Sequence, residues 1–239
     1  MRRSRRGSDA LQITLAIAPG ADTSRASESM AHIPDGVLSA PVLITGGAVT
    51  AGLLAVSLRR LDDRLVPPAA VLSATFFVSS LISVPLGPSS VHLLLNGLMG
   101  LLLGWLAVPA LFVALVLQAA FFGFGGLTVL GVNTMNMALP ALLCALVLRP
   151  LLRHQSSAPS RRGVWWIGAA AGATGVLGTG ALVAGTLALS GAPFFPAAKV
   201  VVLTFVPLAL AESLISAVVV GFLYRVEPGL LAMPEADDG

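Results

Sequence analysis

The feature that most constrains this chain is a long stretch without charge. No Asp, Glu, Lys or Arg occurs from Leu65 to Leu148. A spanning helix needs about 20 apolar residues, so this stretch alone has room for about four membrane segments. Of all 239 residues, 56% are hydrophobic and 10% are charged, whereas a soluble domain carries about 25% charged residues. The composition excludes ordinary soluble, disordered and disulfide-rich secreted proteins.

The rest of the chain extends this membrane pattern. We predict an all-α polytopic membrane protein of about seven transmembrane helices, at 41–58, 66–84, 91–104, 107–123, 131–149, 164–189 and 197–224. The third segment is short and also fits a tilted or re-entrant helix. Segment 164–189 is rich in glycine and alanine, which predicts close helix packing or a docking face for another membrane subunit.

The arginines predict the orientation. They follow the first segment, join the fifth to the sixth, and follow the seventh: Arg59, Arg60, Arg64, Arg149, Arg153, Arg161, Arg162 and Arg225. With seven segments these places share one side, which the positive-inside rule makes cytoplasmic. We therefore expect a multi-pass protein of a bacterial or archaeal plasma membrane, with its N-terminus outside and its C-terminus in the cytoplasm. The pI of about 10.0 then reflects topology rather than nucleic-acid binding.

Two of the three histidines fall on the predicted outer side. His32 precedes the first segment and His92 opens the third, whereas His154 lies in the arginine-rich loop. An ionisable residue at the start of an apolar helix is a functional candidate. A single such histidine is commonly a packing residue. Two of them without a nearby lysine or arginine favour a cation site.

Other polar residues gather towards the same face. Ser90, Asn96, Asn133 and Asn136 are candidates to orient the histidines. Alternatively, the asparagines form helix-to-helix hydrogen bonds, because an unsatisfied amide in hydrocarbon is costly. Gln118 is interpreted as structural. Glu212, inside the last segment, is either a paired structural acid or a coupling residue.

Signs of an enzyme are missing from the sequence. It has no phosphate-binding P-loop and no serine in a nucleophile elbow. It also has no pair of acids within the membrane segments, as a proton-driven pump would tend to have. We therefore expect no catalytic residues and no cofactor.

Several motifs together carry a family resemblance. They are HIPDGVLS at 32–39, PSSVHLLLNGLMGLLLG at 88–104, QAAFFGFGGLTVLGVN at 118–133, PLALAE at 207–212 and RVEPGLL at 225–231. The chain from about 31 to 239 resembles the CbiM/NikM family, the cobalt/nickel substrate-binding components of energy-coupling-factor transporters.

This resemblance implies a subunit that captures Ni²⁺ or Co²⁺ outside the cell, for example to supply cobalamin biosynthesis or nickel enzymes. Its implied partners are a transmembrane coupling protein, cytoplasmic ATPase subunits and a small auxiliary membrane subunit. The family site uses a free terminal amine, the backbone nitrogen and imidazole of the second residue, and a second histidine. The two histidines map onto His32 and His92. The Ser-Val-His context slightly favours nickel over cobalt.

The family pattern places the first histidine next to a chain end. Residues 1–29 are therefore interpreted as a leader or a mis-assigned start, and 30–239 as the single membrane domain. Removal of Met30 would leave the amine on Ala31, and a retained Met30 would supply it instead. Either form makes a nickel-type chelate, and both fail if residues 1–29 stay attached.

Two positions depart from the family pattern, and the sequence also allows two rival functions. Phe124 and Phe205 stand where relatives often carry histidine or another polar residue, and each removes a possible extra ligand. One rival is a membrane-embedded metalloenzyme that uses His32, His92 and Glu212. The other is a structural membrane assembly factor in which both histidines only pack.

Overall fold

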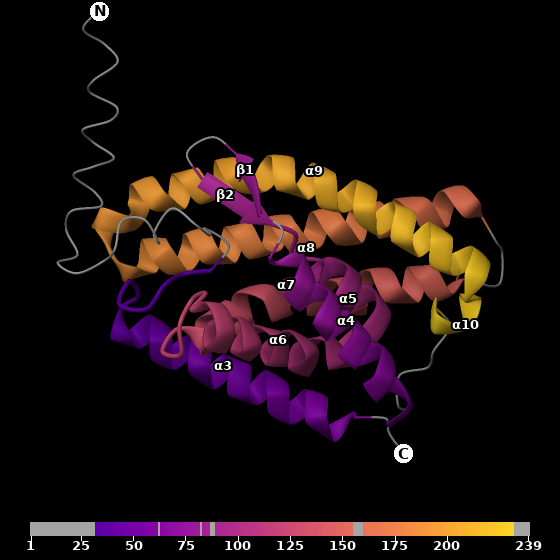
Figure 1. The fold of residues 1–239 in the computed structure, drawn as a ribbon, viewed down its shortest axis with the longest axis horizontal. Helices are drawn as coiled ribbons and strands as arrows, with labels where there is room; N and C mark the ends of the chain where they lie inside the picture. Colours follow the sequence, from indigo (N-terminus) through magenta and orange to yellow (C-terminus); the bar gives the residue numbers. More distant parts are fainter. Residues whose placement is uncertain (1–31, 62, 82, 87–88, 155–159, 232–239) are drawn as a thin grey trace, which may run out of the picture.

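The chain forms a bundle of helices (Figure 1). The computed structural model describes residues 32–61, 63–81, 83–86, 89–154 and 160–231. The α-helices are α3 (Ala40–Arg59), α4 (Val66–Ser79), α5 (Asn96–Leu103), α6 (Ala107–Phe122), α7 (Leu130–His154), α8 (Arg161–Ser190), α9 (Phe195–Val226) and α10 (Pro228–Leu231). Short 3₁₀ turns are η1 (Asp63–Leu65), η2 (Gly104–Leu106) and η3 (Ala192–Phe194), and β1 (Ser83–Leu86) pairs antiparallel with β2 (Ser89–His92).

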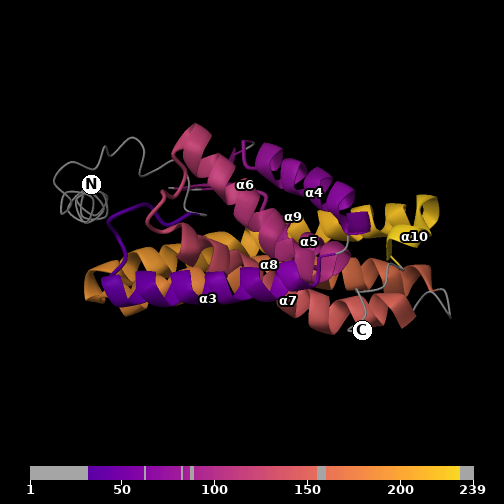
Figure 2. The same cartoon turned by 90° about the horizontal axis from the view of Figure 1, so that it is seen from below.

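Helix α7 lies at the centre of the bundle. It packs against α3, α5, α6 and α8, while α9 packs along α8 and α4 packs along α6. Figures 1 and 2 show α8 and α9 running side by side, with α3 on the other side of the bundle in Figure 1. A Cβ atom at Gly168 would lie 2.9 Å from the Cα of Ala217 in α9, and one at Gly172 would collide with the backbone carbonyl of Glu212. The predicted close packing of segment 164–189 is confirmed at these positions.

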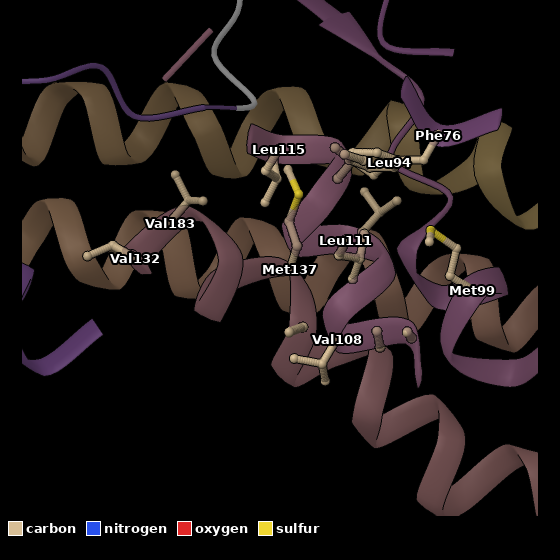
Figure 3. Close-up of a cluster of buried hydrophobic side chains, with 14 of the residues drawn as sticks. Phe76, Leu94, Met99, Val108, Leu111, Leu115, Val132, Met137 and Val183 are labelled. Carbon is tan, nitrogen blue, oxygen red and sulfur yellow. The ribbon is translucent and has the colours of Figure 1, made fainter. Parts of the chain in front are cut away.

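A buried apolar core holds the central helices together. Leu111 and Leu115 of α6 and Met137 of α7 lie at its middle, with Val183 of α8 and Leu94 beside them (Figure 3). All five side chains are buried. Burying one such side chain contributes about 1.5–3 kcal/mol, so this core holds α6, α7 and α8 together.

The helical membrane fold predicted from the sequence is confirmed. Five helical stretches among the described residues are long and apolar enough to cross a membrane: Ala40–Arg59, Asn96–Phe122, Leu130–His154, Arg161–Ser190 and Ala192–Val226. The count of seven spans is not confirmed. The predicted third and fourth segments form one stretch, because η2 joins α5 directly to α6. The predicted second segment corresponds to α4, a shorter apolar helix.

The largest difference from the sequence prediction lies between α4 and α5. We expected helix up to residue 84 and again from 91, but α4 ends at Ser79 and α5 begins only at Asn96. Between them runs the β1–β2 hairpin, in which Ser83 pairs with His92. Pro85 has no N–H for a helical hydrogen bond, and the valines of this segment favour strands. His92 therefore ends a strand instead of opening a helix.

The arginine-bearing ends of the helices lie together. Helices α3, α7 and α9 run in one direction and end at one side of the bundle, where α8 begins (Figure 1). This arrangement agrees with the grouping of the arginines that was used to predict the orientation. The turn between α6 and α7 lies towards the opposite end.

Candidate metal site

The two histidines selected from the sequence lie against each other. His32, which precedes α3, and His92, at the end of β2, are 60 positions apart, yet their Nε2 atoms are 3.2 Å from one another. The ring centroids are 5.1 Å apart and the ring planes differ by 26°. Both side chains are buried. Two buried imidazoles this close together are candidate metal ligands.

Hydrogen bonds define which nitrogen of each ring is free. The Nδ1 atom of His92 lies 3.0 Å from the carbonyl oxygen of Leu93. Because a carbonyl only accepts, this Nδ1 carries the proton and the Nε2 lone pair points to His32. In His32, Nδ1 is buried and has no hydrogen-bond partner among the described residues. With His32 protonated on Nε2, this atom donates to His92 Nε2, and the lone pair of His32 Nδ1 stays without a partner among the described residues.

Burial also sets the protonation of the pair, which lies outside the spanning helices. Burial, and to a smaller extent the neighbouring His92, lowers the pKa of His32 from 6.5 to about 3. Burial likewise lowers the pKa of His92, against the opposing effect of its hydrogen bond to Leu93. Both rings are therefore neutral near pH 7, and the neutral imidazole is the form that binds metal ions.

Asn133 of α7 holds the segment that carries His32. Its Oδ1 accepts a hydrogen bond from the N–H of Ile33, and its Nδ2 donates one to the Ile33 carbonyl, each at 3.2 Å. One amide side chain thus pairs with both backbone groups of the residue after His32. The contact places Asn133 beside the His32 backbone, and the orienting role predicted from the sequence stays a prediction.

Asp35 ties the same segment to the turn before α7. Its Oδ1 accepts hydrogen bonds from the N–H and hydroxyl of Thr128 and from the N–H of Val129, while its own N–H donates to Gly125. A carboxylate over the free N–H groups at a helix N-terminus is favourable. Asp35 was not among the site residues predicted from the sequence, although an Asp-Gly pair directly after His-Ile-Pro is typical of a turn.

The turn before α7 requires glycine at two positions. Gly126 has φ +124°, and a Cβ there would collide with the Asp35 carboxyl group. Gly125 has φ +77°, and a Cβ there would lie 2.7 Å from Asn133 Nδ2. Both positions combine a backbone conformation that favours glycine with close approach of the His32 segment.

The other predicted polar residues lie elsewhere or outside the described parts. Asn96 donates to the Met137 carbonyl and to Thr179 Oγ1, both at 2.9 Å, and Asn136 donates to Thr186 Oγ1 at 3.5 Å. These are the helix-to-helix bonds that formed the alternative interpretation. Gln118 is buried, with no side-chain partner among the described residues.

Three other predicted residues cannot be placed at the site. Met30 and Ala31, and with them the predicted terminal amine, lie outside the described residues, as does leader 1–29. For Ser90 only the backbone, in β2, is described.

Glu212 contacts the turn that follows the hairpin. Its carboxyl oxygens accept hydrogen bonds from the backbone N–H groups of Leu94 and Leu95. The described residues contain no group of three His, Cys, Asp or Glu side chains arranged to hold a metal ion. The rival metalloenzyme built on His32, His92 and Glu212 therefore gains no support.

The two phenylalanines that depart from the family pattern, Phe124 and Phe205, lie in different parts of the structure. The Phe124 ring stacks on His32, with centroids 6.3 Å apart and planes at 14°. A polar side chain at this position would therefore lie beside the site. Phe205 is buried in α9 against Gly180 of α8, so it belongs to the helix packing.

Comparison with known proteins identifies the family. Residues 32–230 match the family model CbiM, described as the cobalt uptake substrate-specific transmembrane region. The chain belongs to the CbiM family. A putative metal transport protein of Haemophilus influenzae is 38% identical over 205 residues, covering 85% of this chain and 98% of that protein.

More distant relatives agree with this assignment to the CbiM family. The fused nickel transport protein NikMN of Rhodobacter capsulatus is 35% identical, covering 84% of this chain and 64% of its own length. A crystal structure of a truncated transition metal transporter superposes with a TM-score of 0.57 at 25% identity, covering 82% of this chain and 99% of that one. The chain is thus a membrane-embedded member of a metal transport family.

Replacing Asn133 with leucine is expected to weaken Ni²⁺ binding by this CbiM protein about tenfold or more. The change keeps the side-chain size but removes both bonds to Ile33, and loss of groups that orient metal ligands costs about 10–100-fold in affinity. Isothermal titration of the purified protein measures the effect. Asn136→Leu, three positions further along α7, is the matched control. Equal affinities for the two variants would contradict the role of Asn133.

Proposed function

We propose that this protein is the substrate-capture subunit of an ATP-driven importer of Ni²⁺ or Co²⁺ of the energy-coupling-factor type. The observation that carries the proposal is the buried pair of His32 and His92, whose Nε2 atoms are 3.2 Å apart. In this role the chain is not an enzyme, and ATP hydrolysis belongs to partner chains. Its family membership and the transport names of its relatives support the same function.

The donor set suits late first-row metal ions. Imidazole is a good ligand for Ni²⁺, and the series from Co²⁺ through Ni²⁺ to Cu²⁺ binds nitrogen sites with increasing affinity. His92 offers Nε2 and His32 offers the unpartnered Nδ1. A terminal amine on Ala31, or on Met30 if it is retained, completes the nitrogen set in this proposal. Mass spectrometry of the native N-terminus tests that part separately.

The proposed direction of transport follows the arginines. The arginine-bearing helix ends face the cytoplasm in this proposal, where a transmembrane coupling protein and ATPase subunits engage the chain. A small auxiliary membrane subunit is a further proposed partner. The histidine site then faces the outside, from which it captures the ion.

The purified protein with its native N-terminus is expected to bind one Ni²⁺ or Co²⁺ ion per chain. Isothermal titration and metal analysis measure the stoichiometry and compare the two ions. Cells that express the chain together with its coupling and ATPase partners are expected to accumulate the radioactive ion, and cells whose ATPase carries an inactive P-loop are not. Absence of binding by the purified chain would refute the capture function, and uptake without ATP hydrolysis would refute the coupling.

A further inference from the structure

One buried acid reaches from the last long helix to the segment that carries His92. Glu212 lies in the middle of α9 and is completely buried. Its Oε1 accepts from the N–H of Leu94, and its Oε1 and Oε2 accept from the N–H of Leu95 at 3.0 and 2.9 Å. These two amides follow His92 by two and three positions. A carboxyl group thus closes the turn directly after the second histidine.

This turn needs an external partner to keep its shape. Leu95 has φ +48°, a left-handed conformation that is costly for a residue with a side chain. It also stands at the N-terminus of α5, where backbone N–H groups have no acceptor within the helix. Glu212 supplies that acceptor, and an acidic group at a helix N-terminus is favourable. The carboxyl group therefore stabilises both the strained residue and the start of α5.

The acid itself is held rigidly. Gly172 of α8 lies so close to Glu212 that a Cβ on the glycine would collide with the Glu212 backbone carbonyl. One turn earlier, Gly168 makes a similar close approach to Ala217 of α9. Because α8 and α9 cannot separate or slide without losing these contacts, the position of Glu212 is fixed by the helix pair.

We propose that Glu212 is a positioning residue of the metal site: it fixes the turn at Leu94 and Leu95 and thereby aims His92 at His32. The chain of contacts runs from the α8–α9 pair through the carboxyl group to the two amides and the adjoining strand. The other end of the site is held independently, by Asn133 and Asp35. Glu212 thus makes the geometry of the ligands depend on the position of α9.

This inference rests on the proposed capture of Ni²⁺ or Co²⁺, so the experiment includes a test of the site itself. The full chain is purified, and Ni²⁺ alone is titrated into the parent protein and into the variants Glu212→Gln, Glu212→Asp, Ser216→Ala and His92→Ala. Affinity is read by calorimetry, and ligand geometry by the visible absorption of bound Ni²⁺. Thermal unfolding without metal checks the fold.

Glu212→Gln keeps the size of the side chain but places an NH₂ group, which cannot accept, against the Leu95 N–H. Binding is expected to weaken by about tenfold or more, with a shifted absorption band. Glu212→Asp keeps the acid on a shorter side chain and is expected to recover part of the affinity. Ser216→Ala, one turn further on α9, removes a buried hydroxyl that has no partner among the described residues and is expected to bind like the parent.

Parental affinity and spectrum in Glu212→Gln, with binding lost in His92→Ala, would overturn the role of Glu212 and leave the capture function standing. Unchanged binding in His92→Ala would instead refute the proposed site. If Glu212→Gln does not fold, Glu212→Asp decides: weaker binding with a shifted band supports the proposal, and parental binding overturns it.

Discussion

Replacing His92 with alanine is expected to abolish high-affinity binding of Ni²⁺ and Co²⁺. The change removes the only imidazole that faces His32 among the described residues. Loss of a group that merely orients a metal ligand costs about 10–100-fold in affinity, so loss of the ligand itself should exceed about 100-fold. Isothermal titration measures the binding, and uptake of the radioactive ion into cells that contain the complete transporter measures the consequence for transport.

The remaining histidine provides the control. His154 is exposed at the end of α7, so His154→Ala is expected to bind both ions like the parent. The structure without metal should tolerate His92→Ala, because the ring makes one backbone hydrogen bond and contacts His32. Parental affinity in a folded His92→Ala protein would show that the ion binds elsewhere.

The helices were predictable because their pattern is local. Apolar stretches separated by prolines, glycines and arginines located α3 and α6 to α9 to within a few residues, apart from the extra turn at the end of α7. The hairpin was missed because an apolar run of this length fits a helix and a strand equally well. Tertiary context decides in such cases. Here the strand β2 brings His92 beside His32.

The pairing of His32 with His92 was predictable from their types and from their predicted position on one side of the membrane. The residues that hold the pair in place could be predicted only in part from the sequence. Asn133 was one of several candidate amides, and nothing in the sequence separates it from Asn96 or Asn136. Its contact with Ile33 spans 100 positions.

Glu212 shows a different limit of sequence analysis. Glu212 stands in the middle of the last predicted segment, 197–224, well away from the outer end of that segment. In the structure, the turn at Leu94 and Leu95 enters the bundle and meets the middle of α9. Depth along a helix therefore did not measure distance from the site, because the chain between β2 and α5 is not helical.

Replacing Gly100 with alanine is expected to destabilise the protein by about 2 kcal/mol. Gly100 of α5 packs so tightly on α7 that a Cβ would collide with the backbone carbonyl of Ala141. Overpacking of this kind costs about 1–3 kcal/mol or more, and the higher helix propensity of alanine offsets only about 1 kcal/mol. Thermal unfolding of the purified protein in detergent measures the change.

The matched control is Gly52→Ala on α3, where a Cβ would meet nothing within 4 Å. At this position the substitution only raises the helix propensity, so the unfolding temperature should equal or exceed that of the parent protein. Because α5 starts four positions after His92, a displaced α5 should also weaken Ni²⁺ binding in Gly100→Ala and leave it unchanged in Gly52→Ala. If both variants unfolded at the parental temperature, α5 would not pack on α7 this closely, and the rigid support assigned to the His92 turn would be lost with it.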